Sequence, residues 1–206
     1  IQSLDPNGKV WLNDKLILDT DNFMRNEICV SHLLKKGENQ LKILVEPRPP
    51  EVFYYWHRHT DCYNGWFCGE VFLTLTQNTY IKHMEVITNE VTPFVNASVN
   101  IDLNQKHNGF IELFISECYP KQSKEERLGI KRFHGKSVSY NFEKKLKLWN
   151  VKSPTLYAIR AVIYDKYKKE TDDFVIETGF RIIEQKDGEI HLNHSKILLN
   201  GALLMQ

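Results

Sequence analysis

The chain has 206 residues with a formal net charge of +1, and 42% of its residues are hydrophobic, including the 12% that are aromatic. This length allows one large domain or two β-sandwiches of about 100 residues each, and the apolar content argues against a largely disordered chain. The balanced charge disfavours a nucleic-acid-binding surface, and no apolar run approaches the roughly 18 residues of a membrane span. The sequence therefore predicts neither a nucleic-acid partner nor a membrane span.

The strand signals along the chain are short, rich in β-branched and aromatic residues, and separated by polar turns. They fall at 10–12, 41–45, 71–75, 80–88, 94–102, 110–115, 138–142, 156–164 and 174–183. Spacing of about 8–15 residues, with Asn, Asp, Gly and Pro between the signals, indicates antiparallel sandwiches rather than alternating strands and helices. The one stretch with helical character is short and charged, at 121–128. The sequence therefore predicts an all-β protein.

A domain boundary is predicted near Gln77 and Asn78, where one strand signal ends shortly before the next begins. Before it, residues 47–69 form a long irregular stretch whose aromatic content argues against disorder. After it comes what reads as a complete set of about seven strands, the number in an immunoglobulin-like sandwich. The expected order is thus a first β domain, a long aromatic loop and a complete sandwich.

Two motifs lie before this boundary. Residues 10–15 read Val-Trp-Leu-Asn-Asp-Lys, with Asn13-Asp14 at the place of a tight hairpin turn. Residues 30–41 read Val-Ser-His-Leu-Leu-Lys-Lys-Gly-Glu-Asn-Gln-Leu, which predicts a helical turn that ends at Gly37 and leads into a core strand.

Three further motifs lie towards the C-terminus. They are Leu-Trp-Asn-Val-Lys-Ser-Pro-Thr-Leu-Tyr at 148–157, Glu-Thr-Gly-Phe-Arg-Ile-Ile-Glu at 177–184 and Leu-Asn-His-Ser-Lys-Ile-Leu-Leu-Asn-Gly at 192–201. We interpret Trp149 and Tyr157 as residues at the head of a strand whose rings close one end of the sandwich. Arg181 is interpreted as an ion-pairing strand residue.

These motifs, in this order, resemble family 2 glycoside hydrolases, which comprise β-galactosidases, β-glucuronidases and β-mannosidases. The resemblance implies that residues 1–77 are the C-terminal part of a jelly-roll, sugar-binding-like domain and that residues 78–186 are an immunoglobulin-like sandwich. It also implies that residues 187–206 begin a catalytic TIM barrel whose remainder is missing from the chain. Gly69 stands where the family carries an arginine, and this departure leaves the sugar specificity open.

No catalytic residue is assigned. Glycoside hydrolysis needs two carboxylic acids facing one bond, about 5 Å apart for retention of configuration. No acidic residue of this chain lies in the Asn-Glu-Pro type of setting that the family uses. Glu112, Glu117 and Glu177, on or beside strands, are interpreted as solvent-facing side chains.

The four cysteines, Cys29, Cys62, Cys68 and Cys118, have no metal-binding spacing. We expect free thiols, although Cys62 and Cys68 are close enough in sequence to form a disulfide in an exported protein. The sequence therefore predicts neither a metal site nor a cofactor.

The candidate substrate-binding residues are Trp56, His57, Asp61 and Trp66, in the aromatic loop at 54–66. Flat rings stack on sugar faces, and His and Asp side chains form directional hydrogen bonds with hydroxyl groups. The resemblance implies that this loop reaches the rim of the barrel's active site. The other interpretation is that the two tryptophans pin the loop to the sandwich or to the barrel.

The resulting hypothesis is a non-catalytic β-sandwich fragment of a glycoside hydrolase that acts on β-linked glycosides. Its partners would be carbohydrate, through the parent enzyme, and the barrel of the same polypeptide. The chain starts at Ile1 without a Met or a leader, so we interpret it as a processed or excised piece, with periplasmic, secreted and cytoplasmic locations all open. The alternative is a free-standing carbohydrate-binding or adhesion module.

Overall fold

The computed structural model describes residues 1, 3–5, 7–20, 24–46, 66–199 and 201. The chain divides into two compact units, Ile1–Thr74 and Leu75–Gln206. The domains derived from the sequence, 1–77, 78–186 and 187–206, stay a prediction. The all-β prediction is confirmed, because every regular element of the described residues is a strand. Among these residues no helix is long and apolar enough to span a membrane.

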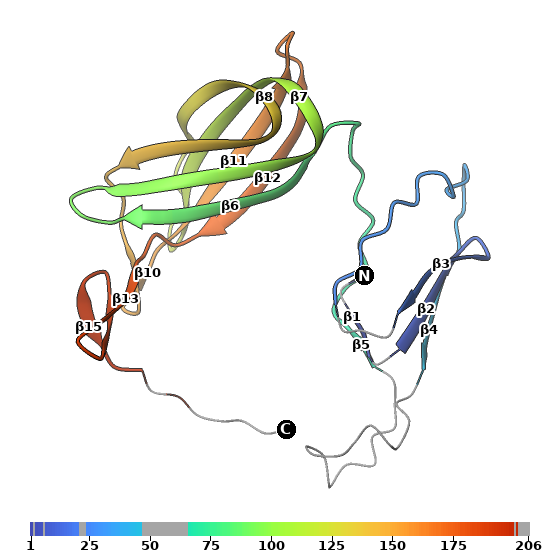
Figure 1. Ribbon diagram of the computed structural model, residues 1–206, viewed down its shortest axis with the longest axis horizontal. Helices are drawn as coiled ribbons and strands as arrows, with labels where there is room; N and C mark the ends of the chain where they lie inside the picture. The colour runs from blue at the N-terminus through green and yellow to red at the C-terminus, as the bar shows by residue number, and fades with distance from the viewer. Residues whose placement is uncertain (2, 6, 21–23, 47–65, 200, 202–206) are drawn as a thin grey trace, which may run out of the picture. The chain divides into compact units, whose positions relative to one another are not determined.

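The first unit consists of two small antiparallel sheets, coloured from blue to green-cyan in Figure 1. Its strands are β1 (Ser3–Asp5), β2 (Asn7–Leu12), β3 (Lys15–Thr20), β4 (Leu41–Glu46) and β5 (Trp66–Cys68). Strand β2 lies between β3 and β4, and β1 pairs with β5. Leu4 of β1 is fully buried, and a Cβ atom at Gly8 of β2 would lie 2.3 Å from its Cδ1 atom. Glycine at this position therefore lets β1 pack directly against β2, within the partial jelly roll.

The second unit is an immunoglobulin-like sandwich. Its main strands are β6 (Ile81–Glu90), β7 (Val95–Tyr119), β8 (Glu126–Lys144), β11 (Leu156–Asp165) and β12 (Glu170–Thr178). These five strands form one hydrogen-bonded sheet, in which the long strands β7 and β8 curl so that each contributes to both layers of the sandwich (Figure 1). The start of β7 pairs with β6 and with the end of β8, whereas the end of β7 pairs with β11 and with the start of β8.

The curl of β7 and β8 explains the strand count expected from the sequence. The pairing of β7 with β8 is interrupted between Asp102 and His107, where the curl leads both strands from one layer of the sandwich to the other (Figure 1). Three undivided strands and the two halves of β7 and β8 thus give seven strand segments. That is the number in an immunoglobulin-like sandwich.

The core of the sandwich follows the alternation of side chains along its strands. Every second residue is buried along 95–103 and 107–115 of β7 and along 157–163 of β11, where Val162 is buried as well, as expected where one face of a sheet is covered. Phe180, which follows β12, is fully buried, and its ring meets that of Phe142 edge-on at 6.0 Å between centroids. Tyr157 of β11 lies 5.5 Å from Phe180 on the same measure. These aromatic rings close one end of the core, as predicted for Tyr157.

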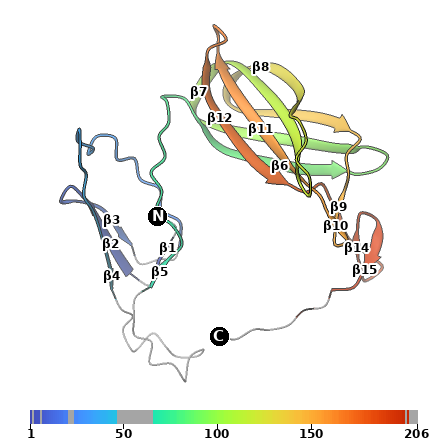
Figure 2. The same ribbon diagram turned by 180° about the vertical axis from the view of Figure 1, so that it is seen from behind.

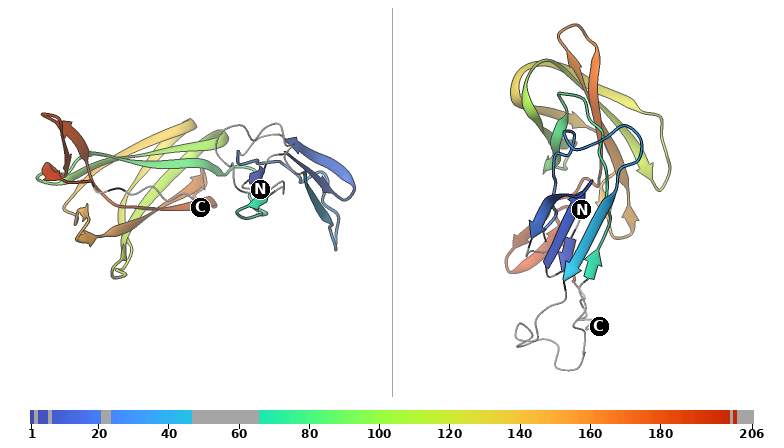
Figure 3. Two further views of the ribbon diagram at one scale, coloured as in Figure 1. Left: turned by 90° about the horizontal axis from the view of Figure 1, so that it is seen from below. Right: turned by 90° about the vertical axis from the view of Figure 1, so that its right-hand side faces the viewer.

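Two small sheets lie at that end of the second unit, where β9, β10, β14 and β15 are seen together in Figure 2. They consist of β9 (Trp149–Asn150) with β10 (Ser153–Pro154), and of β13 (Ile183–Lys186), β14 (Glu189–Leu192) and β15 (Ser195–Ile197). The second of these, called the terminal hairpin sheet below, is the red segment that extends beyond the sandwich strands in Figure 3.

The strand predicted at 71–75 is absent, and this prediction was wrong. Residues 71–77 carry no regular structure, and Leu73 and Leu75 are 63% and 83% exposed. The apolar pattern is that of a strand, but a strand needs a hydrogen-bonded neighbour, and the described residues provide none for this segment.

The helix expected at 121–128 is also absent. Ser123 closes a turn after β7, because its N–H donates to the Glu117 carbonyl and its Oγ accepts from the Glu117 N–H, both at 2.9 Å. The chain then enters β8, where Glu126 pairs with Ile115. The long-range sheet pairing outweighs the local helical preference of the Lys and Glu residues.

The strand predicted at 174–183 is interrupted. Strand β12 ends at Thr178, residues 179–182 lie outside any strand, and Ile183 starts β13. The interruption follows from the packing of Gly179 and Phe180 at the end of the sandwich.

Candidate functional site

The candidate sugar-contacting residues cannot be placed from the structure. Trp56, His57 and Asp61 lie outside the described residues. The backbone of Trp66 belongs to β5, where it pairs with Asp5, but the position of its side chain is not described. Sugar contact and pinning by these residues therefore both stay predictions.

The C-terminal motifs, which are far apart in the sequence, meet at the end of the sandwich. The Trp149 N–H donates to the Phe180 carbonyl at 2.9 Å. A Cβ atom at Gly179 would lie 2.8 Å from the Cβ of Trp149, closer than real side chains approach. The Arg181 guanidinium lies over the Trp149 ring at 4.8 Å, and its Nη1 donates to the Gly179 carbonyl at 3.1 Å. Trp149 is thus the common contact of the segment 179–181.

Arg181 differs from its predicted role. It lies between β12 and β13 rather than in a strand, and it stacks on an aromatic ring. Arginine suits this place because its planar, weakly hydrated guanidinium stacks on indole and still donates to a carbonyl. The spacing of Trp149 and Arg181 in the sequence gives no sign of this contact.

Asn193 ties the terminal hairpin sheet to these motifs. Its N–H donates to the Ile182 carbonyl at 2.9 Å, and its Oδ1 accepts from the Ile182 N–H at 3.1 Å. Its Nδ2 donates to the Trp149 carbonyl at 3.0 Å. Asn193 has a φ of 50°, in the left-handed region that asparagine tolerates better than most residues. One turn residue thereby connects three segments of the chain.

The same arrangement occurs in the first unit around Asn13. Its N–H donates to the Gln40 carbonyl at 2.9 Å, and its Oδ1 accepts from the Gln40 N–H at 3.1 Å. Its Nδ2 donates to the Leu33 carbonyl at 3.0 Å and to Asn39 Oδ1 at 2.8 Å. The two Leu-Asn motifs at 12–13 and 192–193 are therefore the same structural device, used once in each unit.

The turn predicted before β4 ends at Gly37, as expected. Gly37 has a φ of 94°, and the Leu33 N–H donates to the Val30 carbonyl at 2.9 Å. The Asn39 side chain closes this loop, because its Oδ1 accepts from the Lys35 N–H at 2.9 Å and its Nδ2 donates to the Lys35 and Gly37 carbonyls. The Gly-Glu-Asn motif thus positions the backbone that Asn13 binds.

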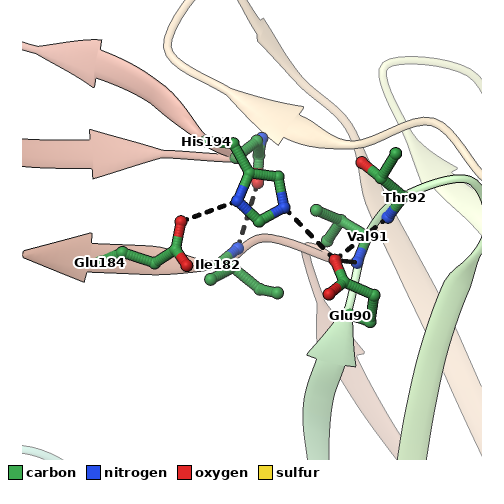
Figure 4. A network of polar contacts seen from close by, with 7 residues as sticks. Glu90, Val91, Thr92, Ile182, Glu184 and His194 are labelled. Carbon is green, nitrogen blue, oxygen red and sulfur yellow. Dashed lines mark hydrogen bonds and ion pairs between the residues drawn. The ribbon is translucent and has the colours of Figure 1, made fainter. Parts of the chain in front are cut away.

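His194, next to Asn193, joins two carboxylates (Figure 4). Its Nδ1 lies 2.8 Å from Glu184 Oε2 on β13, and its Nε2 lies 3.3 Å from Glu90 Oε1 at the end of β6. The hydrogen bond with Glu184, followed by that with Glu90, raises the pKa of His194. Hydrogen bonds from the Val91 and Thr92 N–H groups, followed by that with His194, lower the pKa of Glu90.

Two of the acidic residues interpreted as solvent-facing are largely buried ion-pair partners. The side chain of Glu112 is 16% exposed and accepts from Arg127 Nε at 2.5 Å. That of Glu117 is 13% exposed and pairs with Lys147 Nζ at 2.9 Å. This interpretation was wrong for both, because cations on neighbouring segments cover the outward face of β7. Glu177 is exposed, as predicted.

The described residues show the arrangement of possible metal ligands and the state of two cysteines. These residues contain no group of three or more His, Cys, Asp or Glu side chains that could hold a metal ion. Cys29 and Cys118 are free thiols, and burial raises the pKa of Cys118. Cys62 lies outside the described residues, so the proposed pair with Cys68 stays open.

A family model and a curated relative both connect this chain with family 2 glycoside hydrolases. Residues 1–71 match the glycosyl hydrolase 2 galactose-binding domain-like family. A β-galactosidase of Alteromonas mediterranea is 22% identical over 210 residues, covering 94% of this chain and 19% of that protein. The chain thus spans about a fifth of the length of this curated relative.

Solved structures share the fold over nearly the whole chain. A glycosyl hydrolase family 2 member from Bacteroides cellulosilyticus has a TM-score of 0.72 at 17% identity, over 98% of this chain and 28% of that one. A β-glucuronidase from Ruminococcus gnavus has a TM-score of 0.67 at 14% identity, over 97% of this chain and 35% of that one. The resemblance recognised from the sequence motifs is confirmed: residues 1–71 match the family's galactose-binding domain-like model, and nearly the whole chain has the fold of the N-terminal β domains of solved family 2 structures.

Proposed function

We propose that this chain is the non-catalytic β part of a glycoside hydrolase that acts on β-linked glycosides, in which it supports the catalytic barrel. The observation that carries the proposal is the junction at the end of the sandwich. There hydrogen bonds to backbone carbonyls, from one backbone N–H and two side chains, join Trp149, the segment 179–181 and Asn193. Such a junction fixes the exit of the chain from the sandwich and so suits a part that positions a following domain.

The aromatic loop is the proposed contribution to the active-site rim. In this proposal Trp56 and Trp66 offer ring faces to a sugar, and His57 and Asp61 bind its hydroxyl groups. The loop connects β4 with β5, so both of its ends are held by sheets of the first unit. Binding residues are commonly found on loops that a rigid scaffold positions.

The test compares residues 1–206 with the complete gene product on chromogenic β-galactosides, β-glucuronides and β-mannosides. The complete product should hydrolyse at least one of them, and residues 1–206 alone should hydrolyse none, because the proposal assigns this part no catalytic carboxylate pair. Turnover by residues 1–206 that survives repurification and scales with protein concentration would refute the proposal. Glycan binding by a complete product without any turnover would favour the free-standing carbohydrate-binding module instead.

A further inference from the structure

His194 lies at the turn between β14 and β15 and reaches outside its own sheet. Its φ of 65° places it in the left-handed region, which histidine adopts more readily than most residues. From this position the imidazole reaches Glu184 within the terminal hairpin sheet and Glu90 at the end of sandwich strand β6 (Figure 4). The contact with Glu90 therefore joins the terminal hairpin sheet to the sandwich.

The chemistry of the three groups requires a proton on each ring nitrogen. An ionised carboxylate only accepts hydrogen bonds, whereas neutral imidazole carries a single N–H. Both contacts of His194 can be hydrogen bonds only when the ring is the doubly protonated imidazolium. In the neutral ring, one nitrogen lone pair would face a carboxylate oxygen.

The distances indicate which contact depends on the second proton. Nδ1 is 2.8 Å from Glu184, whereas Nε2 is 3.3 Å from Glu90. Glu90 Oε1 also accepts from the Val91 N–H at 2.7 Å and from the Thr92 N–H at 3.2 Å, so it keeps partners when His194 leaves. The neutral ring should therefore keep its N–H on Glu184 and lose Glu90.

The other ionisable side chains on the same face of the hairpin as Glu184 are Lys186, Glu189, His191 and Lys196, as the strand register shows. Lys196 of β15 pairs with Glu189 of β14. His191 of β14 stands opposite Glu184 in the strand register, so its ring belongs to the same face as that carboxylate. The two carboxylates that meet His194 thus come from β13 and from the end of β6.

We propose that His194 is a protonation-controlled clasp, which holds the terminal hairpin sheet against the sandwich while the imidazole is charged and releases Glu90 when it is neutral. Asn193 keeps its contacts with Ile182 and Trp149 in both states, because these involve amide groups that do not titrate. The released state is therefore a hairpin that stays in register but moves more freely relative to β6.

The pH range in which the clasp is closed follows from the shifted pKa values of His194 and Glu90. The pKa of His194 is raised in the folded protein, so the clasp is present below the ordinary histidine range and is lost as pH rises through the raised value. The pKa of Glu90 is lowered, so its contribution persists into acid and is lost as pH falls through the lowered value. The clasp is thus closed from mildly acidic to near-neutral pH.

The test is an NMR pH titration of the 206-residue chain, with three variants. Glu90→Gln removes the charge but keeps an oxygen for the Val91 and Thr92 N–H groups, and His194→Asn keeps a residue that tolerates the left-handed turn. His83→Asn, at an exposed histidine of β6, is the matched control.

In the unmodified chain, the His194 ring and the Val91 amide should titrate with one midpoint. As pH rises through this midpoint, the hydrogen-exchange protection of the β13–β15 amides, corrected for intrinsic rates, should fall by about two- to fivefold. A fall of this size is expected for an exposed ion pair. Glu90→Gln should lower the titration midpoint of the His194 ring and remove the fall in protection. His194→Asn should remove the titration of the Val91 amide. The control His83→Asn should leave the ring midpoint, the Val91 titration and the protection unchanged. A ring midpoint that Glu90→Gln leaves unchanged, or protection that does not follow it, would overturn the proposal.

Discussion

Asn193 pairs with Ile182 as a strand residue would, except that its side-chain Oδ1 replaces its own backbone carbonyl as the acceptor. The two hydrogen bonds measure 2.9 and 3.1 Å, the same values as those between Asn13 and Gln40 in the first unit. In each unit an asparagine at the first position of a tight turn thus forms a sheet-like pair and leaves Nδ2 free to bind a third segment.

Asn193→Ala should lower the free energy of unfolding of the second unit by about 1–3 kcal/mol, because the Ile182 N–H and the Trp149 carbonyl each lose a partner. Denaturant unfolding measures the change. Asp187→Ala is the control for backbone strain, since Asp187 also has a left-handed φ, of 52°, and an exposed side chain. If the two variants lose equal stability, the cost comes from the turn conformation and not from the hydrogen bonds.

Gly179→Ala should destabilise the second unit by about 1–3 kcal/mol, as is usual for overpacking. The new methyl group would lie 2.8 Å from both Cβ and Cδ1 of Trp149. The Trp149 ring also stacks with the Arg181 guanidinium, which restricts its movement away from the methyl group. Gly201→Ala, where the added Cβ meets open space, is the matched control. Thermal melts of the two variants that coincide would contradict the packing described here.

Asp172→Asn should change stability in a pH-dependent way. Burial raises the pKa of Asp172, whose carboxylate accepts from the Ile81 N–H at 2.8 Å and so links β12 with β6. A raised folded pKa means that the wild-type side chain contributes most below its unfolded pKa and that this contribution is lost as pH rises through the folded value. The variant keeps an acceptor oxygen but does not ionise.

The stability of Asp172→Asn relative to wild type should therefore be more favourable at pH 7 than below about pH 4, where the aspartate itself becomes neutral. Denaturant unfolding at the two pH values measures this difference. A difference that is constant, or larger in acid, would mean that the carboxylate is stabilised in its ionised form.

The aromatic loop requires kinetics of the complete gene product. If the loop lines the sugar site, Trp56→Ala and Asp61→Ala should lower kcat/KM and leave the melting temperature nearly unchanged. If its rings pin the loop instead, Trp56→Ala should cost about 3–5 kcal/mol of stability with activity per folded molecule intact. A steady-state assay and a thermal melt on the same samples separate the two cases.

Local sequence signals predicted those features whose causes are local. The turns at Asn13 and Gly37 and most strand segments of the sandwich follow from turn residues and from alternating burial, whereas the start of β8 carried no strand signal. The signals at 71–75 and 121–128 misled because pairing with distant segments decides whether a strand forms. Residues 71–75 have the apolar pattern of a strand, and residues 121–128 have charged residues that favour helix. Neither pattern indicates whether a distant segment is available to pair with.

The junction could be recognised from its motifs, but its contacts could not be derived from them. The stacking of Arg181 on Trp149 and the contact of His194 with Glu90 join residues that only the folded sandwich brings together, the latter pair 104 positions apart. The motif Gly-Phe-Arg gains its physical reason only in the structure, where Trp149 leaves no room for a side chain at position 179.

If residues 1–206 hold no catalytic carboxylate, covalent labelling of the complete gene product should modify a residue outside this range. A retaining glycosidase forms a glycosyl-enzyme intermediate on its nucleophile, and slow fluorinated glycosides trap it. The complete gene product should be inactivated by such a reagent, and peptide mass spectrometry should place the sugar on a carboxylate outside residues 1–206. A stoichiometric label on an Asp or Glu within residues 1–206 would contradict the claim.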